Sequence, residues 1–596
     1  MKHVLLEEDA LEASRKRVKR IHQGAFDPVA RTKKSVTVLD AADGDGVRGS
    51  RAGLFKYKYK NIQDPIHEFM EFHPSLVALM DTPQFQRLRG LKQLGASHLV
   101  FPGATHTRFD HSLGVAHLGM TFVKQLKARQ PELGIDDVDV LCVGIAGLCH
   151  DLGHGPFSHL FDGTFLSKNK EWTHERGSAL MFRYMLEDNK IDLKRDFEFN
   201  DLDLVFIEEL ILGKKIPGGV NARKGRGHEK QFLYDIINNE RSGFDVDKLD
   251  YLLRDTYFCG VPIAIGMSVD RIFQIALVLP DENNIPTISF PEKAVQSFFN
   301  VFHARMQLHI HVYQHKVVKA CELMICEVFE LANDILKFKS KKTGKFLRMS
   351  ESVNDMSVFC QLKDSVLDLI QLSQDPKMKP AQLLLDRLMR RDIYRSCGKM
   401  ELQNHGRGLP MKSTAIQTAM LAISVEDGSG LTENDFYVEV MQVHHGQGTN
   451  NPVDGLRFHN KLAGTTQPIS PSQVQQRAPR SSNFQSPGSV ASFPTSQHSV
   501  ASCSYSAQRC FKIDQRKYEG GVIPRRFGVT GVRVFAKSEE KRDLVAKCFV
   551  KWTRRETMSS PLCHNSQSTP LEEECKTPTP ENRLKFLNND DDDEPF

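Results

Sequence analysis

A histidine–aspartate pair, His150-Asp151, ends an apolar stretch that begins at Val138 and is typical of a buried helix. Two further histidines, His154 and His159, follow in a glycine-punctuated turn. Neighbouring residues on a helix point about 100° apart, so an imidazole and a carboxylate at a helix end can converge on one cation. Nitrogen and oxygen ligands of this kind suit Fe, Mn, Mg or Zn. The pair therefore predicts part of a hydrolytic metal site.

A third histidine lies at the start of another predicted helix. Either Asp110 or Ser112 can cap this helix, which places His111 in its first turn. The helix dipole disfavours a charged imidazole there but tolerates a neutral, metal-ligating one. His111 is therefore a candidate ligand, with plain packing as the alternative.

An acidic run marks a further helix, which we expect to start near Asp245. At four-residue spacing, one face of this helix carries Asp247, Tyr251 and Asp255. A run of this kind is more often a solvated helix start than a ligand set, so it gains meaning only beside the histidines.

A cationic segment could form the wall of an anion pocket. Residues 301–316 combine four histidines with Arg305, Tyr313, Gln314 and Lys316 at helical spacing. Arginine can contact two phosphate oxygens at once, which a triphosphate requires. The alternative is an ordinary surface helix with clustered histidines.

The elements that must position these residues are mostly helices. After Tyr57 we expect a short strand or hairpin, then helical sequence with Pro83 at a helix start after Asp81 and Thr82, and further helices to about Met400. Alternation predicts a strand over 435–443, and a helix is expected over 538–552. The fold class predicted is mainly α: a helical bundle with small β elements and a smaller mixed α/β C-terminal lobe.

The 596 residues suffice for one large helical domain with accessory regions. We expect a disordered basic tail at 1–56, a core at 57–462, a disordered Ser/Gln/Pro-rich insertion at 463–508, a C-terminal lobe at 509–555 and a disordered acidic tail at 556–596. The sequence has no run of 18 apolar residues, so no membrane span is expected.

Charge and cysteine usage indicate the compartment. Twelve cysteines without a C-x-x-C pair, and an N-terminus unlike a signal peptide, favour reduced thiols in a nuclear or cytoplasmic protein. The net charge of +5 is too small to demand a polyanionic partner. The basic cluster at 15–20 is a candidate for nuclear import or for contact with single-stranded nucleic acid.

The order H…HD…D, formed by His111, His150-Asp151 and Asp247, is the ligand pattern of the HD phosphohydrolase superfamily. Longer motifs resemble the SAM-and-HD-domain dNTP triphosphohydrolase family nearly continuously over residues 57–460. They include D-T-P-Q-F-Q-R-L-R-x-x-K-Q-L-G, C-H-D-L-G-H-G-P-F-S-H-x-F-D-G, D-V-D-K-x-D-Y and F-H-x-R-x-x-L-H-x-x-x-Y-Q-H-K. The N-terminal region is too short and irregular for a SAM domain.

The resemblance implies an HD-domain helical bundle that hydrolyses a deoxynucleoside triphosphate to deoxynucleoside and inorganic triphosphate. His111, His150, Asp151 and Asp247 would hold the metal. His159 would be the general acid, oriented by Asp162, with His154 and His174 lining the reacting phosphate. Phosphates would be held by Arg108, Lys248, Arg305 and Tyr313, with His309 also in the substrate site, and the sugar by Gln93, Tyr251, Asp255 and Gln314.

Control by nucleotide-driven tetramerisation is also implied. The positions matching a GTP activator site are Lys60, Asp81, Gln86 and Arg89, and those matching a second, dNTP-preferring site are Val100, Arg271, Lys293 and Lys461. Departures from the family at Gln63, Pro291 and Ile310-His311 bear on activator choice and tetramer formation. In the tail, Thr577-Pro578 and residues 583–586 resemble a kinase site and a cyclin-docking motif.

The biological roles implied are lowering of cellular dNTP pools and restriction of viral replication. Two alternatives stay open. The first is another HD-type phosphohydrolase that acts on a monophosphate or cyclic nucleotide, although a monophosphate needs fewer cations than this chain offers. The second is a nucleic-acid-binding antiviral factor whose metal site is secondary.

Overall fold

The structure, a computed structural model, describes residues 59–167, 169, 171–213, 216, 222–239, 241–402, 412–460, 509–513 and 527–558. These residues all belong to one compact unit, Tyr57–Phe596. The predicted N-terminal tail, the Ser-rich insertion, Lys461 and the residues from 559 onward lie outside the described residues.

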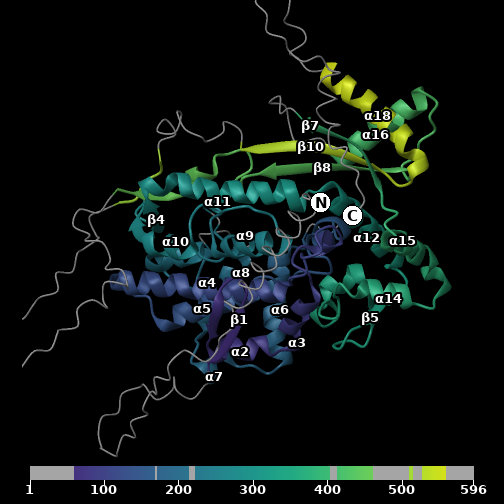
Figure 1. Cartoon of the computed structure of the whole chain (residues 1–596). Helices are drawn as coiled ribbons and strands as arrows, with labels where there is room; N and C mark the ends of the chain where they lie inside the picture. Colours follow the sequence, from purple (N-terminus) through teal and green to yellow (C-terminus); the bar gives the residue numbers. More distant parts are fainter. Residues whose placement is uncertain are drawn as a thin grey trace, which may run out of the picture. The chain divides into compact units, whose positions relative to one another are not determined.

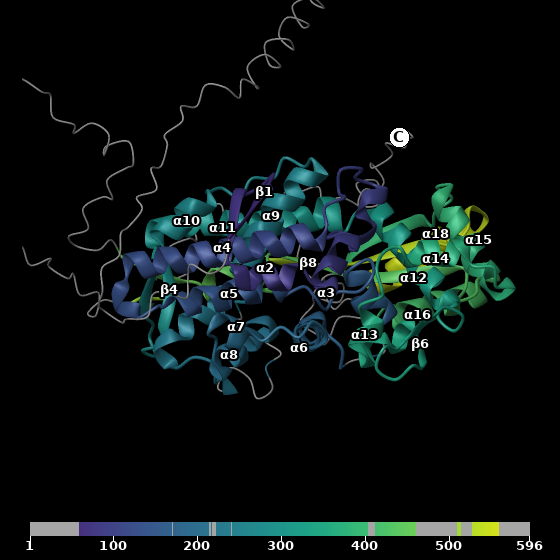
Figure 2. The ribbon, with the colours of Figure 1, turned by 90° about the horizontal axis from the view of Figure 1, so that it is seen from below.

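A helical bundle forms most of the described chain, which confirms the mainly α prediction (Figures 1 and 2). Its helices are α2 (Pro74–Met80), α3 (Pro83–Gln86), α4 (Arg108–Arg129), α5 (Asp137–Cys149), α6 (His174–Asp188), α7 (Leu193–Phe197), α8 (Asp201–Leu212), α9 (Val246–Cys259), α10 (Val269–Ile275), α11 (Val295–Leu308), α12 (Lys316–Ala332), α13 (Met356–Phe359), α14 (Val366–Leu372) and α15 (Lys379–Met389).

Helices α4 and α5 pack closely at the centre of the bundle because α5 is glycine-rich. A Cβ added at Gly147 would lie 3.1 Å from the backbone of Ala116, and one at Gly144 would lie 2.7 Å from Met120. Helix α9 packs against α4, and α8 against α5. The ends of α4, α5 and α9 thereby meet, as a ligand set drawn from three helices requires.

Small β elements surround the bundle. The predicted hairpin after Tyr57 is present, with β1 (Lys60–Asp64) antiparallel to β2 (Glu68–Phe72). A three-stranded sheet has the order β3 (Leu277–Pro280), β4 (Pro286–Pro291), β9 (Arg457–His459), and a second hairpin pairs β5 (Lys337–Lys339) with β6 (Phe346–Arg348).

The C-terminal lobe is a mixed α/β unit, as predicted, but it begins earlier in the chain than residue 509. Its sheet has the order β7 (Arg395–Leu402), β10 (Gly528–Ala536), β8 (Phe436–His444), all antiparallel. Helices α16 (Ser413–Glu426) and α18 (Glu539–Met558) lie beside this sheet in Figure 1 and share a hydrophobic cluster with it. The predicted strand over 435–443 and helix over 538–552 correspond to β8 and α18.

Alternate residues of β8 face two different neighbours. Phe436 packs into the hydrophobic cluster with α16 and α18. Tyr437 and Glu439 face α12, where the Tyr437 hydroxyl donates to Glu327 at 3.0 Å and Glu439 lies 3.5 Å from Lys319. The lobe is therefore joined to the bundle by polar contacts through α12.

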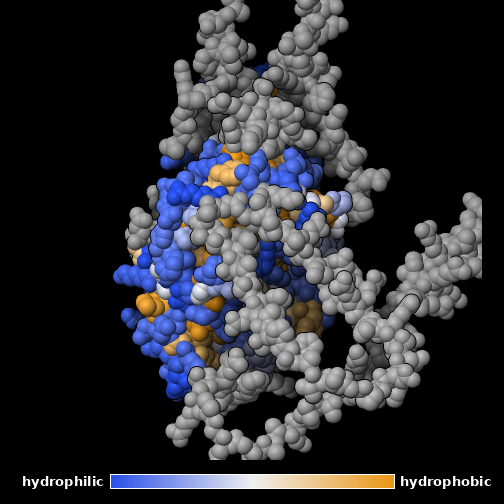
Figure 3. All heavy atoms as spheres, turned by 90° about the vertical axis from the view of Figure 1, so that its left-hand side faces the viewer, coloured by the Kyte–Doolittle hydropathy of each residue, from blue (hydrophilic) through white to orange (hydrophobic). Residues whose placement is uncertain are grey.

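The face of the molecule in Figure 3 mixes hydrophilic and hydrophobic residues. No helix among the described residues is long and apolar enough to span a bilayer.

Candidate metal and substrate site

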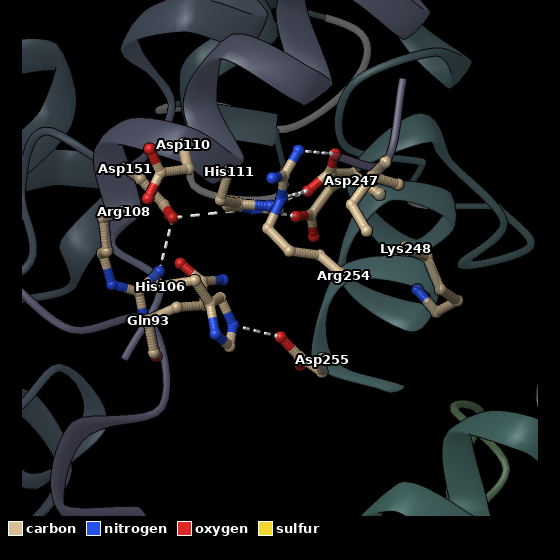
Figure 4. Close-up of polar contacts among 12 residues, drawn as sticks. Gln93, His106, Arg108, Asp110, His111, Asp151, Asp247, Lys248, Arg254 and Asp255 are labelled. Atoms are coloured by element: carbon tan, nitrogen blue, oxygen red, sulfur yellow. Dashed lines mark hydrogen bonds and ion pairs between the residues drawn. The ribbon is translucent and has the colours of Figure 1, made fainter. Parts of the chain in front are cut away.

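The four predicted metal ligands converge at the meeting point of α4, α5 and α9. Figure 4 labels three of them, His111, Asp151 and Asp247. The His111 Nε2 atom lies 2.9 Å from an Asp247 oxygen and 3.7 Å from an Asp151 oxygen. The His150 Nε2 atom lies 3.4 Å from Asp151 and 3.5 Å from Asp247. Asp247 keeps 34% of its side chain exposed, whereas His111 is almost fully buried, so the centre opens towards Asp247.

Hydrogen bonds to the other ring nitrogens aim both imidazoles at this centre. His111 Nδ1 lies 2.6 Å from Asp250, and His150 Nδ1 lies 2.7 Å from the Gly147 carbonyl. His150 Nε2 is buried without a hydrogen-bond partner among the described residues. Metal-ligating histidines usually donate their second N–H in this way. Two imidazoles and two carboxylates with this geometry fit a divalent metal.

The charges at this centre stabilise one another in the protein alone. Burial opposes protonation of His111, but hydrogen bonds with Asp247 and Asp250 outweigh it and raise the pKa of this imidazole to about 10. Burial likewise opposes ionisation of Asp151, yet Arg108 and His150 hold the pKa of that carboxyl well below its usual range. The buried carboxylates therefore make this centre favourable for positive charge.

The N-terminal caps of α4 and α9 explain where two of the predicted ligands lie. Helix α9 starts where the sequence predicted, and Asp245 is its cap, accepting the Lys248 N–H at 3.0 Å. Helix α4 starts earlier than predicted. Thr107 is its N-cap, and Asp110 lies at the third helical position, where it accepts the Thr107 N–H at 2.9 Å. The prediction that Asp110 or Ser112 caps this helix is thus wrong, because Asp110 completes a capping box instead.

A second cluster gathers the residues predicted for proton transfer. One ligand atom from each of His154, His159, Asp162 and His174 lies within 4.8 Å of the others. The His154 and His174 rings stack at 4.2 Å, and His159 meets both edge-on. Asp162 lies 3.0 Å from His154 Nδ1 and 4.0 Å from His174 Nδ1. Its close partner is thus His154, whereas the sequence led us to expect Asp162 beside His159.

The backbone before His159 is strained. Phe157 and Ser158 both have positive φ angles, 58° and 57°, which side-chain-bearing residues rarely adopt. Strain of this kind is about 1–3 kcal/mol per residue and gathers at functional sites. His159 keeps a solvent-exposed side and packs edge-on against two other histidine rings, whereas His154, two residues before Pro156, is buried.

Two buried residues that the sequence did not single out hold this loop. Arg87 donates to the carbonyls of Leu152 at 3.2 Å and His154 at 2.7 Å. Asp364 accepts the Phe157 N–H at 2.8 Å. Arg87 lies in the motif D-T-P-Q-F-Q-R-L-R, but neither residue is near the loop in sequence, so the sequence did not connect either one with it.

The predicted sugar and phosphate contacts line the same region. Arg108 pairs with Asp151 and donates to Ser158 at 2.9 Å. Asp255 accepts from His106 at 2.8 Å, as drawn in Figure 4, and also from the Tyr313 hydroxyl. Lys248 lies 3.5 Å from Asp245 and 5.9 Å from the ring centre of Tyr251.

The segment after α11 departs from the continuous helix that the sequence led us to expect. His309–Tyr313 form a π-turn, η9, and α12 begins only at Lys316. π-turns often occur at functional sites. Arg305 donates to the His444 carbonyl at 2.6 Å, and Arg533 of β10 donates to the Gln314 carbonyl at 3.0 Å. The C-terminal lobe thus supports this part of the site.

Several polar atoms in the substrate set are buried without a hydrogen-bond partner among the described residues. They are Gln93 Oε1, His309 Nδ1 and Gln314 Oε1. Burial and the nearby Arg305 lower the pKa of His309 to about 2, so this ring is neutral. Buried polar atoms normally have partners, so these three are suited to a polar ligand.

The first predicted activator set lies together in one cavity of about 560 Å³. Lys60 donates to Asp81 at 3.2 Å, and Arg89 donates to Gln86 at 2.8 Å. The Arg89 guanidinium stacks on Phe109, 3.4 Å from its ring centre. Gln63, one of the departures from the family, lines the same cavity.

The second predicted activator set is spread over separate elements of the chain. Val100 follows a short 3₁₀ turn and is half-buried, Arg271 lies exposed on α10, and Lys293 lies exposed before α11. Lys461 lies outside the described residues. These assignments stay predictions.

A His, His-Asp, Asp set at the ends of three packed helices defines the HD class of metal-dependent phosphohydrolases, and the HD domain family matches residues 108–234. The chain is 39% identical over 438 residues to the human deoxynucleoside triphosphate triphosphohydrolase SAMHD1, covering 70% of this chain and 68% of that protein. The Xenopus laevis protein of the same name is 34% identical (84% and 75%), and the Dictyostelium discoideum homologue is 30% identical (84% and 82%). The chain therefore belongs to the HD-domain deoxynucleoside triphosphate triphosphohydrolases of the SAMHD1 type.

Proposed function

We propose that this enzyme hydrolyses deoxynucleoside triphosphates to deoxynucleoside and inorganic triphosphate. The observation that carries the proposal is the convergence of four residues, His111, His150, Asp151 and Asp247. They lie next to the cationic residues of the predicted substrate site, where several buried polar atoms lack a hydrogen-bond partner among the described residues. The named activity of the relatives supports the same substrate class.

The four ligands would hold a divalent ion. Such an ion supplies positive charge to phosphate oxygens and makes a bound water acidic enough to attack near neutral pH. Arg108, Lys248, Arg305 and Tyr313 would bind the triphosphate. Arg108 now pairs with Asp151, so an incoming phosphate and the ion would each take over one partner of that pair.

The chemical step is attack of water on the α-phosphorus with cleavage of its bond to the 5′ oxygen. That oxygen leaves as an alkoxide and needs a proton, which we assign to His159. Although His159 keeps an exposed side, desolvation of its ring by the surrounding site, together with His154 and Arg108, lowers the pKa of the free imidazole well below its usual value. A bound triphosphate brings several negative charges beside this ring, which favours the protonated form needed for donation. Asp162 would act through His154, its nearest neighbour.

Selection of the sugar falls to Tyr251, Asp255, Gln93 and Gln314. The Tyr313 hydroxyl and His106 fix both oxygens of Asp255, which pre-organises that carboxylate. Close packing of Tyr251 against the sugar would leave no room for a 2′-hydroxyl and so would favour deoxyribose.

We further propose that the cavity lined by Lys60, Asp81, Gln86 and Arg89 binds GTP as an activator. Asp81 and Arg89 offer the acceptor and donors that a guanine edge requires, and the volume admits a nucleotide. Assembly into a homotetramer, a second dNTP site at Val100, Arg271, Lys293 and Lys461, and a role in lowering dNTP pools available to viruses belong to the same proposal.

The experiment is product analysis with purified protein, a divalent metal and one dNTP, with and without GTP. Triphosphate and deoxynucleoside in equal amounts are expected, with faster release when GTP is present. Release of pyrophosphate or single phosphate would refute the reaction and favour another HD phosphohydrolase. Equal rates with and without GTP would refute only the activator proposal.

A further inference from the structure

A buried carboxylate behind the metal centre, Asp250, receives four polar contacts. His111 Nδ1 and His67 Nε2 each lie 2.6 Å from one of its oxygens. Arg254 donates to both oxygens, each at 2.9 Å. Asp250 and Arg254 have no exposed side-chain surface. Asp250 is therefore fixed in position by three side chains, of which one is a predicted metal ligand.

From the predicted metal centre, the network of contacts continues to the β1–β2 hairpin. Arg254 also pairs with Asp64 at 2.9 Å, and Asp64 accepts the N–H groups of Ile66 and His67, both at 2.9 Å. Asp64 thus shapes the turn that carries His67, and His67 returns to Asp250. Every member of this loop of contacts has a partner, which is the condition for a stable buried charge network.

One glycine leaves the space that this network fills. Gly114 lies three residues after His111, on the same side of α4. A Cβ added there would lie 1.8 Å from an Asp250 oxygen and 2.6 Å from Arg254, far inside the 3.0 Å below which real contacts essentially never occur. A side chain at position 114 would therefore force Asp250 away from His111 or move the helix that carries His111.

We infer that Asp250 is the positioning residue for the metal ligand His111, that His67 and Arg254 hold it in place, and that Gly114 makes its position possible. Asp250 does not face the substrate. It orients the His111 ring and keeps the proton on Nδ1, so that Nε2 presents a lone pair to the metal. The inference rests on the proposed metal site but not on the identity of the substrate.

Gly114→Ala tests the inference without removing a polar group. Alanine favours a helix over glycine by about 1 kcal/mol, so helix propensity alone predicts equal or greater stability. We expect instead that the dissociation constant for Mn²⁺ rises 10–100-fold, the usual effect of losing an outer-shell partner. The matched control is Gly119→Ala on the same helix, whose new Cβ would meet two side-chain methyls at 3.1 Å and the Val143 carbonyl at an ordinary 3.9 Å. It should bind Mn²⁺ like the wild type.

Asp250→Asn should weaken Mn²⁺ binding to a similar degree. His67→Gln alters only a partner of Asp250, so it should weaken Mn²⁺ binding less. In an Asp250→Ala background, Gly114→Ala should add little further loss, because the carboxylate it displaces is gone. Mn²⁺ titration and the melting temperature of the metal-free protein are measured for every variant.

Unchanged Mn²⁺ affinity in the folded Gly114→Ala and Asp250→Asn proteins would overturn the inference, even if both melt earlier. Wild-type protein that binds Mn²⁺ but releases no triphosphate from a dNTP would refute the proposed reaction while leaving this inference intact.

Discussion

Arg87 offers a prediction whose magnitude follows from its contacts. Its guanidinium is 1% exposed and donates to three backbone carbonyls, those of Leu362 at 2.9 Å, Leu152 at 3.2 Å and His154 at 2.7 Å. It also lies 4.8 Å from the ring centre of Phe359. The substitution considered is Arg87→Met, which keeps much of the volume and removes all donors.

Two opposing contributions decide the result. Each buried carbonyl left without a donor costs about 1–3 kcal/mol, so three of them cost about 3–9 kcal/mol. Burial lowers the pKa of Arg87 to about 10. At about 1.4 kcal/mol per pKa unit, keeping this side chain charged in the folded protein costs roughly 3 kcal/mol of stability. Arg87→Met removes the charge and therefore regains this amount. Subtracting the recovered amount of about 3 kcal/mol leaves a loss of about 0–6 kcal/mol in the free energy of unfolding, with a midpoint of about 3 kcal/mol.

The assay is thermal and urea unfolding of the metal-free protein, followed by Mn²⁺ titration. Because Arg87 holds the loop from Leu152 to His154, next to Asp151, metal affinity should fall together with stability. Exposed Arg390→Met is the control and should change the free energy of unfolding by less than about 0.5 kcal/mol. Arg87→Met protein that unfolds like the control would show that these hydrogen bonds contribute nothing net, and the reasoning would be refuted.

Three other outcomes are expected. The double change His150→Ala, Asp151→Ala should abolish bound metal, measured by elemental analysis, together with dNTP hydrolysis; activity that survives would show that the metal ligands are assigned wrongly. Tyr251→Ala should weaken the preference for deoxyribose. The ratio of kcat/KM for a dNTP to kcat/KM for the matching ribonucleotide should fall by about 10-fold, which is the scale of one lost steric contact. An unchanged ratio would show that Tyr251 does not select the sugar. Burial opposes ionisation of Glu327, but hydrogen bonds and charge from Tyr394, Lys537 and Tyr437 outweigh burial and lower the pKa of this carboxyl. The ionised Glu327 therefore stabilises the fold above its unfolded-state pKa, and this stabilisation is lost as the pH falls through the lower folded-state value. The melting temperature of Glu327→Gln should accordingly fall less between pH 6 and pH 4 than that of the wild type, and parallel curves would contradict this.

The parts of the site that follow local rules could be predicted from the sequence. Asp245 caps α9 and places Asp247 in its first turn because an aspartate before a helical run accepts the free N–H groups. The same rules misplaced the cap of α4, since Thr107 and Asp110 act as a pair. The predicted cap, Asp110, and the observed cap, Thr107, are three residues apart, which is the usual uncertainty of a helix boundary predicted from sequence.

Features that depend on distant contacts could not be predicted. Asp250 and His111 are 139 residues apart, and Arg87 and Leu362 are 275 apart. The π-turn at His309–Tyr313 has helical composition, and its interruption is stabilised in part by Arg533, which lies far along the chain. Gly114 looks like an unfavourable residue in a helix until the carboxylate opposite it is known.

The strand order of the C-terminal sheet has a consequence for how the protein is made. The central strand, β10, is the last to leave the ribosome, so β7 and β8 must wait for more than 80 residues of further synthesis before they gain their shared neighbour. Until then both strands present unpaired edges, which are prone to association with other chains. Arg533 on β10 also supplies the bond to the Gln314 carbonyl, so one wall of the candidate substrate site is completed only after β10 has been synthesised. A nascent chain that stalls before β10 would carry all four predicted metal ligands beside an incomplete candidate site.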